Sequence, residues 1–346
     1  MLKKKVALIG LGYTAQITHL KCILYSKNCV LTTVFDERTK LKKKIKSRYN
    51  IKNELENLDD INNYKNDIDI VILCVDRFKQ ASYLEKILSF NFHVLCEKPF
   101  SINSKVSKKL VKLAKKNKLS CMIGFMKVHD AGSKKLKLAI SKNLSSVTKG
   151  NFRASLFGGD LRNGAFWRIK TNEKIIKGNE IELVNNSIKK KNRLSYLIFL
   201  NRYHHSLNLI FYLFDIKLSK VKNFNLSKID NFSFKIKFQY RKIYFDLNFG
   251  NSSSKKWVEF YNFKSKDTEY LLELESPFNV QNSGRLFTKK GRYNKIYSNY
   301  ELGYSWSFKN QLEYFLKNLK KEKLINNIES CYKEQIFLEK NWRKLK

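Results

Sequence analysis

Short apolar runs alternate with amphipathic, lysine-rich stretches over the first third of the chain. Each run is rich in β-branched or aromatic residues and ends at a turn or polar residue, which is typical of a buried strand. A stretch between two of these runs, Lys105–Lys116, repeats its apolar positions near a period of 3.6 and predicts a helix. Alternating strands and helices predict a doubly wound α/β domain around a parallel sheet. The expected strands are Val6–Ile9, Val30–Phe35, Ile70–Val75, Val94–Cys96 and Cys121–Phe125.

A different pattern begins near residue 127. Phe232–Phe249 alternates apolar and polar positions on either side of a turn near Tyr240–Lys242, which predicts an antiparallel hairpin. The Lys- and Asn-rich stretch from about Asn172 to Asn192 is expected to be a loop or a mobile insertion. We therefore expect a doubly wound domain over 1–126 and an α+β domain with a largely antiparallel open sheet over 127–346. Its further elements are expected at Val258–Tyr261 and Tyr270–Leu274 as strands, and at Ser307–Leu319 and Ile328–Leu345 as helices.

Length and composition exclude several classes of protein. The chain has 346 residues, which corresponds to about two domains. A hydrophobic share of 43%, with 14% aromatic residues, is enough to build cores and excludes a disordered chain. The longest apolar runs fall far short of the roughly 20 residues of a spanning helix, and the run behind Met1–Lys5 is too short for a signal peptide. The 6 cysteines form no CxxC pair and no metal-ligand spacing. These features predict a cytoplasmic protein with reduced thiols and no metal site.

The charge of the chain is strongly positive. Lys and Arg number 69 and Asp and Glu 30, so 69 − 30 gives +39. A basic surface attracts polyanions, which makes nucleic-acid binding one hypothesis. The basic runs Lys40–Lys46, Lys134–Lys137 and Lys189–Lys191 are dispersed, however, and none is interleaved with aromatic residues as a stacking platform would be. The excess of Lys, Asn and Ile is typical of an AT-rich coding sequence. We therefore expect solvated basic faces without a specific nucleic-acid partner, and at most attraction of anionic substrates.

The first expected strand runs directly into a glycine-containing turn. Gly10–Ala15 reads GLGYTA and is followed by an amphipathic stretch, which is the strand–GxGxxA–helix arrangement of a dinucleotide-binding Rossmann domain. Gly10 allows the tight turn, Gly12 has no Cβ to block a pyrophosphate, and Ala15 lets the helix pack closely on the strand. The helix N-terminus then offers N–H groups and a partial positive charge to the phosphates. The residues expected to bind the cofactor here are Gly10, Gly12, Tyr13, Thr14 and Ala15.

The second expected strand ends in a carboxylate. Asp36 follows Val30–Phe35 and lies about 20 residues beyond the turn, where an acid accepts hydrogen bonds from the adenosine ribose hydroxyls. Its negative charge would repel a 2′-phosphate, which favours NAD over NADP. Arg38 lies two residues further on and could accommodate that phosphate. NAD is therefore the expected cofactor, and NADP stays possible.

The segment His93–Pro99 reads HVLCEKP and follows the expected strand at the edge of the sheet where such folds place their chemistry. Lys98 could present its ammonium to a substrate hydroxyl, and Pro99 fixes the turn that directs it. With the glycine turn and Asp36, this segment resembles the Gfo/Idh/MocA oxidoreductases, the family of glucose–fructose oxidoreductase and inositol dehydrogenase. IDIVILCV before it, GFMKVHDAG at 124–132 and SFKNQLEYFL at 307–316 also resemble segments of that family.

The resemblance implies an enzyme that oxidises or reduces a secondary alcohol or ketone of a sugar, cyclitol or nucleotide sugar with NAD(P). It also implies a second domain whose open sheet often mediates oligomerisation, hence a homo-oligomer such as a dimer or tetramer. Lys98 would contact both substrate and nicotinamide. Asp76 and Gln80 depart from the family, because many members carry Pro and His there. The further cofactor contacts that the resemblance implies are Cys74, Val75, Asp76 and Glu97.

A second family motif, Asp followed by His four residues later, aligns with Asn201 and His205, and Asn208 stands where another Asp is common. His205 could take the hydroxyl proton of the substrate. Asn201 can orient this imidazole but supplies no negative charge, so His205 would be a weaker base, or the proton could pass through Lys98. A shift of one residue in the alignment would make His204 the functional imidazole.

The substrate residues are the least determined part of the resemblance. Trp167 and Arg168 could line a sugar site by stacking and by binding a diphosphate, or could be a packed tryptophan and a surface arginine. Val128 stands where an Arg is common, and Ser195–Leu200 replaces a glycine-rich stretch of the family. The expected substrate contacts are Lys98, Lys127, Trp167, Arg168, His205 and Asn208.

Three other functions compete with the dehydrogenase. A protein that binds dinucleotide or sugar without turnover is one, since the family includes a galactose-pathway transcriptional repressor and two family Asp positions are Asn here. NAD-assisted cleavage of glycosides, also found in the family, is a second. Nucleic-acid binding through the positive charge is the third and ranks last, since no base-reading module is visible.

Overall fold

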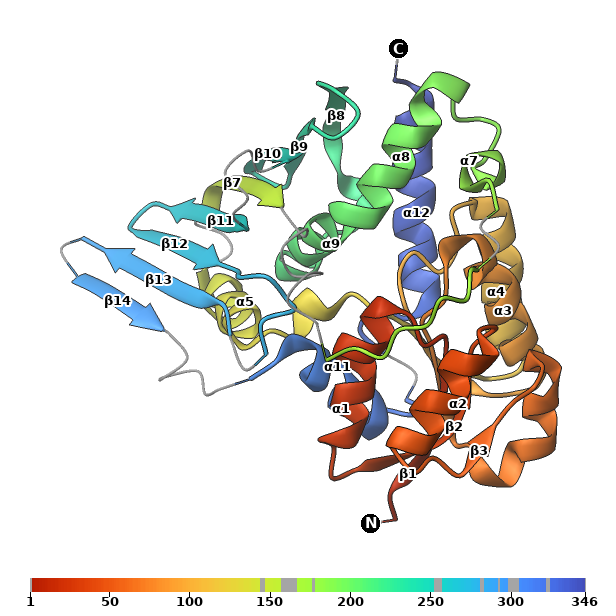
Figure 1. The fold of residues 1–346 in the computed structure, drawn as a ribbon. Coiled ribbons are helices and arrows are strands. Elements are labelled where there is room, and N and C mark those ends of the chain that lie inside the picture. Colours follow the sequence, from red (N-terminus) through yellow and green to blue (C-terminus); the bar gives the residue numbers. More distant parts are fainter. Residues whose placement is uncertain are drawn as a thin grey trace. The chain divides into compact units, whose positions relative to one another are not determined.

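The structure is a computed structural model that describes residues 2–143, 147–156, 167–175, 178–251, 257–280, 283–291, 293–297, 305–321 and 324–345. The chain forms two compact units (Figure 1). Unit 1 consists of Met1–Gly124, Gly164–Asn185 and Gln311–Lys333. Unit 2 consists of Phe125–Asn163, Asn186–Asn310 and Glu334–Lys346. The expected division into 1–126 and 127–346 does not anticipate that two later segments return to unit 1.

Unit 1 is built on a six-stranded parallel sheet of order β3-β2-β1-β4-β5-β6. This order, in which the chain starts in the middle and builds outward in both directions, is that of a doubly wound dinucleotide-binding fold. The five strands expected from the apolar runs are all present and all parallel, so the predicted fold class is confirmed. The strands are β1 Lys4–Ile9, β2 Cys29–Phe35, β3 Asn53–Glu54, β4 Ile70–Leu73, β5 His93–Cys96 and β6 Cys121–Ile123.

Helices α3 and α4 of unit 1 begin where a polar side chain accepts from a free N–H group of the first turn. The Asp76 carboxylate accepts from the Phe78 amide at 3.0 Å at the start of α3, and Asn103 accepts from the Lys105 amide at 3.0 Å at the start of α4. The predicted helix over Lys105–Lys116 is therefore present. The helices are π-helix η1 Ala15–Leu20, α1 Lys21–Leu24, α2 Thr39–Arg48, η2 Leu58–Asp67, α3 Arg77–Ser89 and α4 Ser104–Lys116.

The stretch expected as a loop or mobile insertion is largely anchored on unit 1. It contains the short helix α7, Glu180–Leu183, and the start of α8, and only 176–177 within it lie outside the described residues. Figure 1 shows α7 beside α3 and α4. The Asn103 side chain donates to the Leu183 carbonyl at 3.2 Å, and Asn185 donates to Ser104 at 3.3 Å. The part of this stretch up to Asn185, expected to be a loop or a mobile insertion, thus belongs to unit 1.

Unit 2 contains an eight-stranded sheet of order β14-β13-β12-β11-β7-β10-β9-β8, antiparallel except for the β7–β10 pair. The predicted hairpin is β9–β10, with Tyr240 paired to Ile243 and Arg241 at φ +56° in the turn. The two expected strands that follow are β11 and β12. The strands are β7 Val147–Leu156, β8 Lys222–Lys228, β9 Phe234–Tyr240, β10 Ile243–Asn251, β11 Val258–Ser265, β12 Thr268–Glu273, β13 Arg285–Lys290 and β14 Tyr293–Tyr297.

One face of this sheet packs against helices, because buried and exposed positions alternate along β9 and β11. Trp342 of α12 is fully buried among aromatic rings, with centroids 5.5 Å from Phe234, 5.9 Å from Phe199 and 5.5 Å from Tyr196. Aromatic burial therefore fixes the C-terminal turns of the chain to the sheet of unit 2. The remaining helices are η3 Met126–His129, α5 Ala131–Asn143, α8 Lys190–Arg202, α9 His204–Leu213, η5 Leu218–Lys220, α11 Ser307–Lys317 and α12 Ile328–Arg343.

Two further expectations concern the cysteines and the membrane. All six cysteines are free thiols, and all but the half-buried Cys74 are buried. Across the described ranges, no helix has the length and apolar content needed to cross a bilayer.

Candidate functional site

The turn after β1 is shaped by one close approach. Gly10 has φ +89°, and a Cβ on it would lie 2.2 Å from the carbonyl oxygen of Cys74 and 2.8 Å from Val75 Cγ1, so no larger residue fits. Gly12, in contrast, borders open space, because a Cβ there would meet no protein atom within 4 Å. Ala15, at the start of the π-helix, is fully buried. The turn is thus tight against β4 and open at Gly12, which fits a pyrophosphate lying against backbone.

The Asp36 carboxylate, which follows β2, accepts four hydrogen bonds. Asp36 Oδ2 accepts from the Leu11 amide at 2.7 Å and from Arg38 Nη2 at 2.9 Å. Its Oδ1 accepts from the Arg38 amide at 3.0 Å and from Arg38 Nε at 2.8 Å. Burial alone would raise the pKa of Asp36, but these donors outweigh it and lower the pKa. Since a carboxylate has about four acceptor positions, a ribose hydroxyl can bind Asp36 only if Arg38 moves.

A buried glutamine joins the carboxyl ends of β4 and β5. Gln80 Oε1 accepts from the Val75 amide at 3.2 Å, while its Nε2 donates to the Glu97 carbonyl at 2.8 Å and lies 3.1 Å from Cys96 Sγ. It is 2% exposed, so these bonds form in a dry environment. Gln80 was noted in the sequence only as a departure from the family pattern, and its role as a brace between two strand ends was missed.

The signature segment is held by a second residue that the sequence did not indicate. His19 Nε2 lies 2.8 Å from Glu97 Oε1, and both side chains are buried. The other carboxylate oxygen accepts from the Lys98 amide at 3.2 Å. A Cβ on Gly124 would lie 3.1 Å from Glu97 Oε1, so the next strand end also leaves room for this carboxylate. The backbone of Lys98 is thereby fixed, while its side chain is half-buried at the edge of the sheet.

Trp167 and Arg168 lie against the first helix of unit 1. Lys21 Nζ is 4.1 Å from the centroid of the Trp167 ring, and the Arg168 guanidinium carbon is 4.9 Å from the centroid of the Tyr13 ring. Both are cation–π contacts. Lys21 of α1 supplies the cation in the first contact, and Arg168 supplies it in the second. The structure thus places Arg168 against the turn and Trp167 against α1, while a role of either residue in binding substrate stays a prediction.

Residues 4–125 match the model of the GFO_IDH_MocA family, described as an oxidoreductase family with an NAD-binding Rossmann fold. This segment is a Gfo/Idh/MocA Rossmann domain. The resemblance seen in HVLCEKP and the glycine turn is therefore confirmed, as is the oxidoreductase family with an NAD-binding fold. No curated protein sequence matches the chain.

Solved structures of similar fold extend over both units. A dehydrogenase (MviM) from Clostridium difficile is 17% identical, with a TM-score of 0.72 and coverage of 98% of each chain. A 3-ketoreductase from Actinomadura kijaniata, solved with TDP-benzene and NADP, is 13% identical with a TM-score of 0.73, over 99% of this chain and 98% of that chain. A protein from Desulfitobacterium hafniense assigned as an NADPH-dependent oxidoreductase is 15% identical with a TM-score of 0.77, over 100% of this chain and 96% of that chain. At these identities the likeness shows the fold.

Beyond the Gfo/Idh/MocA domain, two adjacent histidines open helix α9 in unit 2. The residue before them, Tyr203, interrupts the helix, and α8 ends at Arg202. His204 and His205 are buried, and their rings meet the Phe125 ring edge-on at centroid distances of 4.7 and 5.4 Å. Asn201 lies in the last turn of α8 and is exposed. His205 and Asn208 both lie on α9, three residues apart and therefore on one side of the helix.

A carboxylate from the C-terminal helix lies beside these residues within unit 2. Asn208 Nδ2 donates to both oxygens of Glu334, each at 3.0 Å, and His204 Nε2 is 3.4 Å from Glu334 Oε2. Glu334 is 8% exposed. The carboxylate that is missing at Asn201 in the sequence thus has a counterpart, but on α12 and beside His204. Nothing in the sequence pattern could have indicated Glu334, which lies 126 residues from Asn208.

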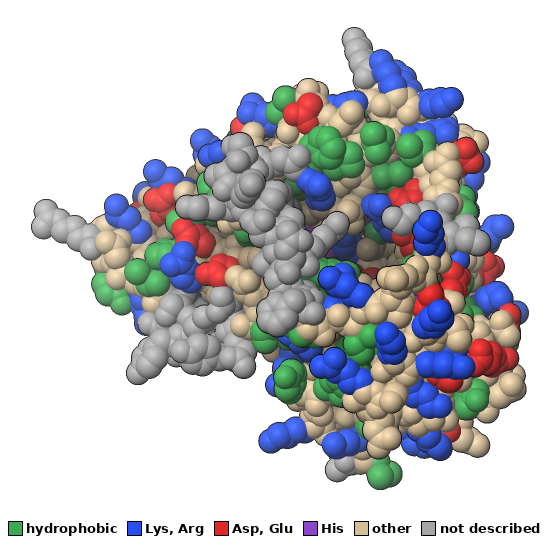
Figure 2. Space-filling view, in the orientation of Figure 1, with side chains coloured by type: hydrophobic (Ala, Val, Ile, Leu, Met, Phe, Trp, Pro, Cys, Tyr) green, Lys and Arg blue, Asp and Glu red, His purple; other side chains and the backbone are tan. Residues whose placement is uncertain are grey.

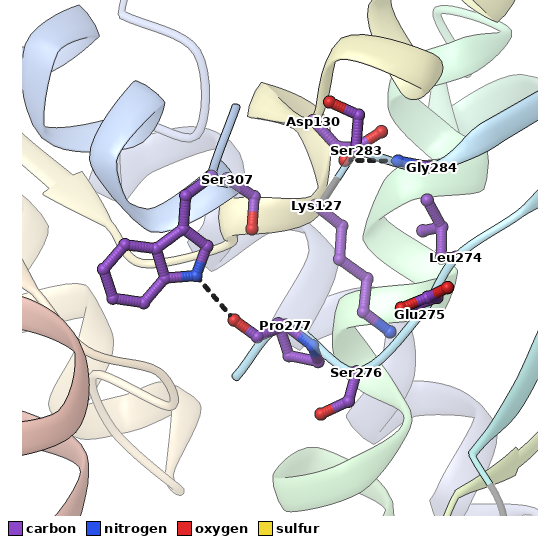
Figure 3. Close-up of a pocket in the computed structure, with 10 residues that line it drawn as sticks. Lys127, Asp130, Leu274, Glu275, Ser276, Pro277, Ser283, Gly284 and Ser307 are labelled. Atoms are coloured by element: carbon purple, nitrogen blue, oxygen red, sulfur yellow. Dashed lines mark hydrogen bonds between the residues drawn. The ribbon is translucent and has the colours of Figure 1, made fainter. Parts of the chain in front are cut away.

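Lys127, expected to contact substrate, is the centre of a buried ion pair. Its Nζ lies 2.6 Å from Glu259 Oε1 and 3.0 Å from Ser206 Oγ, and the Tyr261 hydroxyl donates to the same carboxylate at 2.5 Å. Burial lowers the pKa of Lys127, and the Glu259 charge opposes that shift. Lys127 also lines a small pocket beside Asp130 (Figure 3). A substrate would have to compete with Glu259 for this ammonium.

Within the described residues, no group of three or more His, Cys, Asp or Glu side chains could hold a metal ion. Lys and Arg side chains are scattered over the face shown in Figure 2 and interspersed with acidic ones. This agrees with the dispersed basic runs of the sequence.

The buried pair of Lys127 and Glu259 predicts a non-additive pair of variants. Glu259→Gln leaves the ammonium without its counter-charge and should lower the free energy of unfolding by about 3 kcal/mol at neutral pH. Adding Lys127→Met removes the charge that lost its partner and should restore most of that loss. Urea unfolding of both variants and the parent chain measures this. A double variant as unstable as Glu259→Gln would contradict this description of the pair. In Glu259→Gln the loss should shrink as pH rises towards 10.5, because the unfolded chain then no longer holds the extra proton.

Proposed function

We propose that the protein is an NAD(P)-dependent oxidoreductase that transfers hydride between the nicotinamide and a secondary alcohol or ketone of a sugar, cyclitol or nucleotide sugar. The observation that carries the proposal is Lys98 at the end of β5, fixed by Glu97 in a domain of an NAD-binding oxidoreductase family. Its ammonium can stabilise a substrate oxygen that gains negative charge as its carbon gives up hydride.

The residues of unit 1 suit a dinucleotide. Gly12 has open space for the pyrophosphate, and Asp36 offers a carboxylate for the adenosine ribose once Arg38 moves. The strand ends at Cys74–Asp76 and Glu97 would border the remainder of the cofactor. The bound nicotinamide would supply or accept the hydride. We propose NAD as the preferred form, because the negative charge of Asp36 would repel a 2′-phosphate.

Oxidation of a substrate alcohol removes the hydroxyl proton, which requires a side chain that can act as a base near neutral pH. We propose His205 for this role, since a neutral imidazole can accept the proton that Lys98 polarises. Asn201 is exposed and uncharged, so it would give this imidazole little electrostatic support. His204, with Glu334 beside it, is the alternative base.

A nucleotide sugar is the substrate class with the most support. The 3-ketoreductase of similar fold was solved with TDP-benzene. Arg168 could pair with a diphosphate if it left Tyr13, and Asn208 and Lys127 are further proposed contacts. The exposed rings of Tyr244 and Tyr293, 62% and 64% exposed on the sheet of unit 2, suit a homo-oligomer such as a dimer or tetramer. We propose a cytoplasmic location from the six free thiols.

Replacing the catalytic ammonium should separate turnover from binding. Lys98→Met keeps much of the side-chain volume and removes the charge, so turnover of an active sugar substrate should fall by at least about a hundredfold. The dissociation constant for NADH, measured by nicotinamide fluorescence, should change by less than about threefold. Lys105→Met, on the exposed side of α4, is the matched control and should leave both values unchanged. Full turnover in Lys98→Met would refute the role given to this residue.

A protein that binds dinucleotide without turnover is the second candidate, and one observation favours it. The position that would carry the motif's carboxylate, Asn201, is both uncharged and exposed. The Asn208 amide is in turn committed to Glu334. Under this reading NADH binds, and no sugar, cyclitol or nucleotide sugar is converted.

The two histidines can be told apart by matched substitutions. His205→Gln should lower kcat by about a hundredfold and abolish the acidic limb of the pH profile, because the base is lost. His204→Gln should lower kcat by less than about tenfold. The reverse order would assign the base to His204 and Glu334. Steady-state kinetics of both variants across pH gives the answer.

A further inference from the structure

The described residues 167–175 and 178–185, here called the strap, lie across one edge of unit 1. Gln16 Nε2 donates to the Ile169 carbonyl at 3.1 Å, and its Oε1 accepts from the Ile169 amide at 2.9 Å. Gln16 is 3% exposed, so this paired contact ties the beginning of the strap to the helix that follows the dinucleotide turn.

The middle part of the strap contacts the N-terminus of the next helix, α2. Glu173 Oε1 accepts from the Lys40 amide at 2.9 Å, and Oε2 accepts from the Leu41 amide at 3.0 Å. The hydroxyl of Thr171 also donates to Oε2, at 2.9 Å. Arg38, the residue that precedes α2, offers no side-chain cap of its own. A carboxylate more than a hundred residues away in sequence therefore caps the N-terminus of α2.

The remainder of the strap continues along the same edge. Glu180 Oε2 lies 2.7 Å from Arg77 Nη2 at the start of α3, and Leu183 accepts from Asn103 at the start of α4. In a parallel α/β fold the helices begin at the carboxyl ends of the strands, which is the edge where dinucleotides bind. The strap thus contacts the N-terminal ends of α2, α3 and α4, along the edge of the sheet where a dinucleotide would bind.

The groups at the end of β2 are what distinguishes NAD from NADP in such a fold. A 2′-phosphate lies beside the acid that follows β2 and needs cations or N–H donors there. The two candidate donors are the Arg38 guanidinium and the first N–H groups of α2. In this structure the first is bound by Asp36 and the second by Glu173. Arg38 Nε and Nη2 and the amides of Lys40 and Leu41 therefore already bind an internal carboxylate.

We propose that Glu173 is a specificity-determining residue, whose carboxylate takes the place of the 2′-phosphate at the N-terminus of α2 and so selects NAD over NADP. The inference rests on the proposed dinucleotide function and extends it to a residue of the strap. Glu173 is ionised at neutral pH. Burial opposes that state, but the donors from Lys40, Thr171 and Leu41 lower its pKa. A doubly charged phosphate would meet like charge and occupied donors there.

Glu173→Gln tests the inference, because the amide oxygen can still accept from α2 while the charge is gone. The dissociation constant for NADPH, measured by nicotinamide fluorescence at low salt, should fall by about tenfold. That for NADH should stay within about threefold of the parent. The gain for NADPH should shrink at higher ionic strength, since salt screens a charge that is only partly buried.

Glu182→Gln is the matched control. Glu182 lies on the same strap and accepts from Asn179 at 2.8 Å, so the substitution changes the total charge equally without touching α2. It should leave the ratio of the two dissociation constants unchanged. Equal gains in Glu173→Gln and Glu182→Gln would reduce the effect to general charge and overturn the inference.

Two further outcomes distinguish a failure of this inference from a failure of the proposed function. A ratio of NADPH to NADH affinity that stays within threefold in Glu173→Gln would show that Glu173 only caps α2, and the inference would fall while the proposed function stood. A parent chain that binds neither dinucleotide would refute the proposed function, and the inference with it. Thermal unfolding of the apo variants confirms that Glu173→Gln is folded, so that a loss of both affinities counts against the inference.

Discussion

The close approach of Gly10 to the end of β4 is the constraint on which the cofactor half of the molecule depends. The 2.2 Å between a Cβ on Gly10 and the Cys74 carbonyl oxygen would push the turn away from the sheet if any side chain were present. With the turn in place, the Leu11 amide reaches Asp36 and Gly12 faces open space. Because β4 is braced to β5 by Gln80, the position of Lys98 is coupled to the same packing.

Carboxylates are scarce in this chain, and several buried ones hold functional elements in place. Asp36 orders the loop after β2, Glu97 fixes the backbone of Lys98, and Glu334 lies beside the histidine pair. Each lies in a low-dielectric environment where a hydrogen bond to a charged group is strong and a missing partner is costly. Although the chain has a large positive excess, its candidate sites thus depend on a few internal negative charges.

The sequence was sufficient to predict elements that depend on local or periodic patterns of residues. The parallel strands and the β9–β10 hairpin follow from hydrophobic periodicity, and the turn at Gly10–Ala15 follows from residue type and spacing. Contacts between distant segments were beyond its reach. Glu334 lies 126 residues from Asn208, and Glu173 lies 133 residues from Lys40. Such pairs carry no periodic signal, because each partner is chosen by the folded backbone. The strap looked like a loop for the same reason, since its polar residues bind helix ends rather than a core.

The central claim is that the turn after β1 holds a dinucleotide, and one substitution tests it without disturbing the fold. Gly12→Ala places a methyl group where no protein atom lies within 4 Å, so the melting temperature should not change. The same methyl group should obstruct a pyrophosphate and weaken NADH binding by at least about tenfold in a fluorescence titration. Saturable binding by the parent chain with loss in Gly12→Ala is the predicted result. Equal affinity in the two chains, or no binding by the parent, would contradict the account.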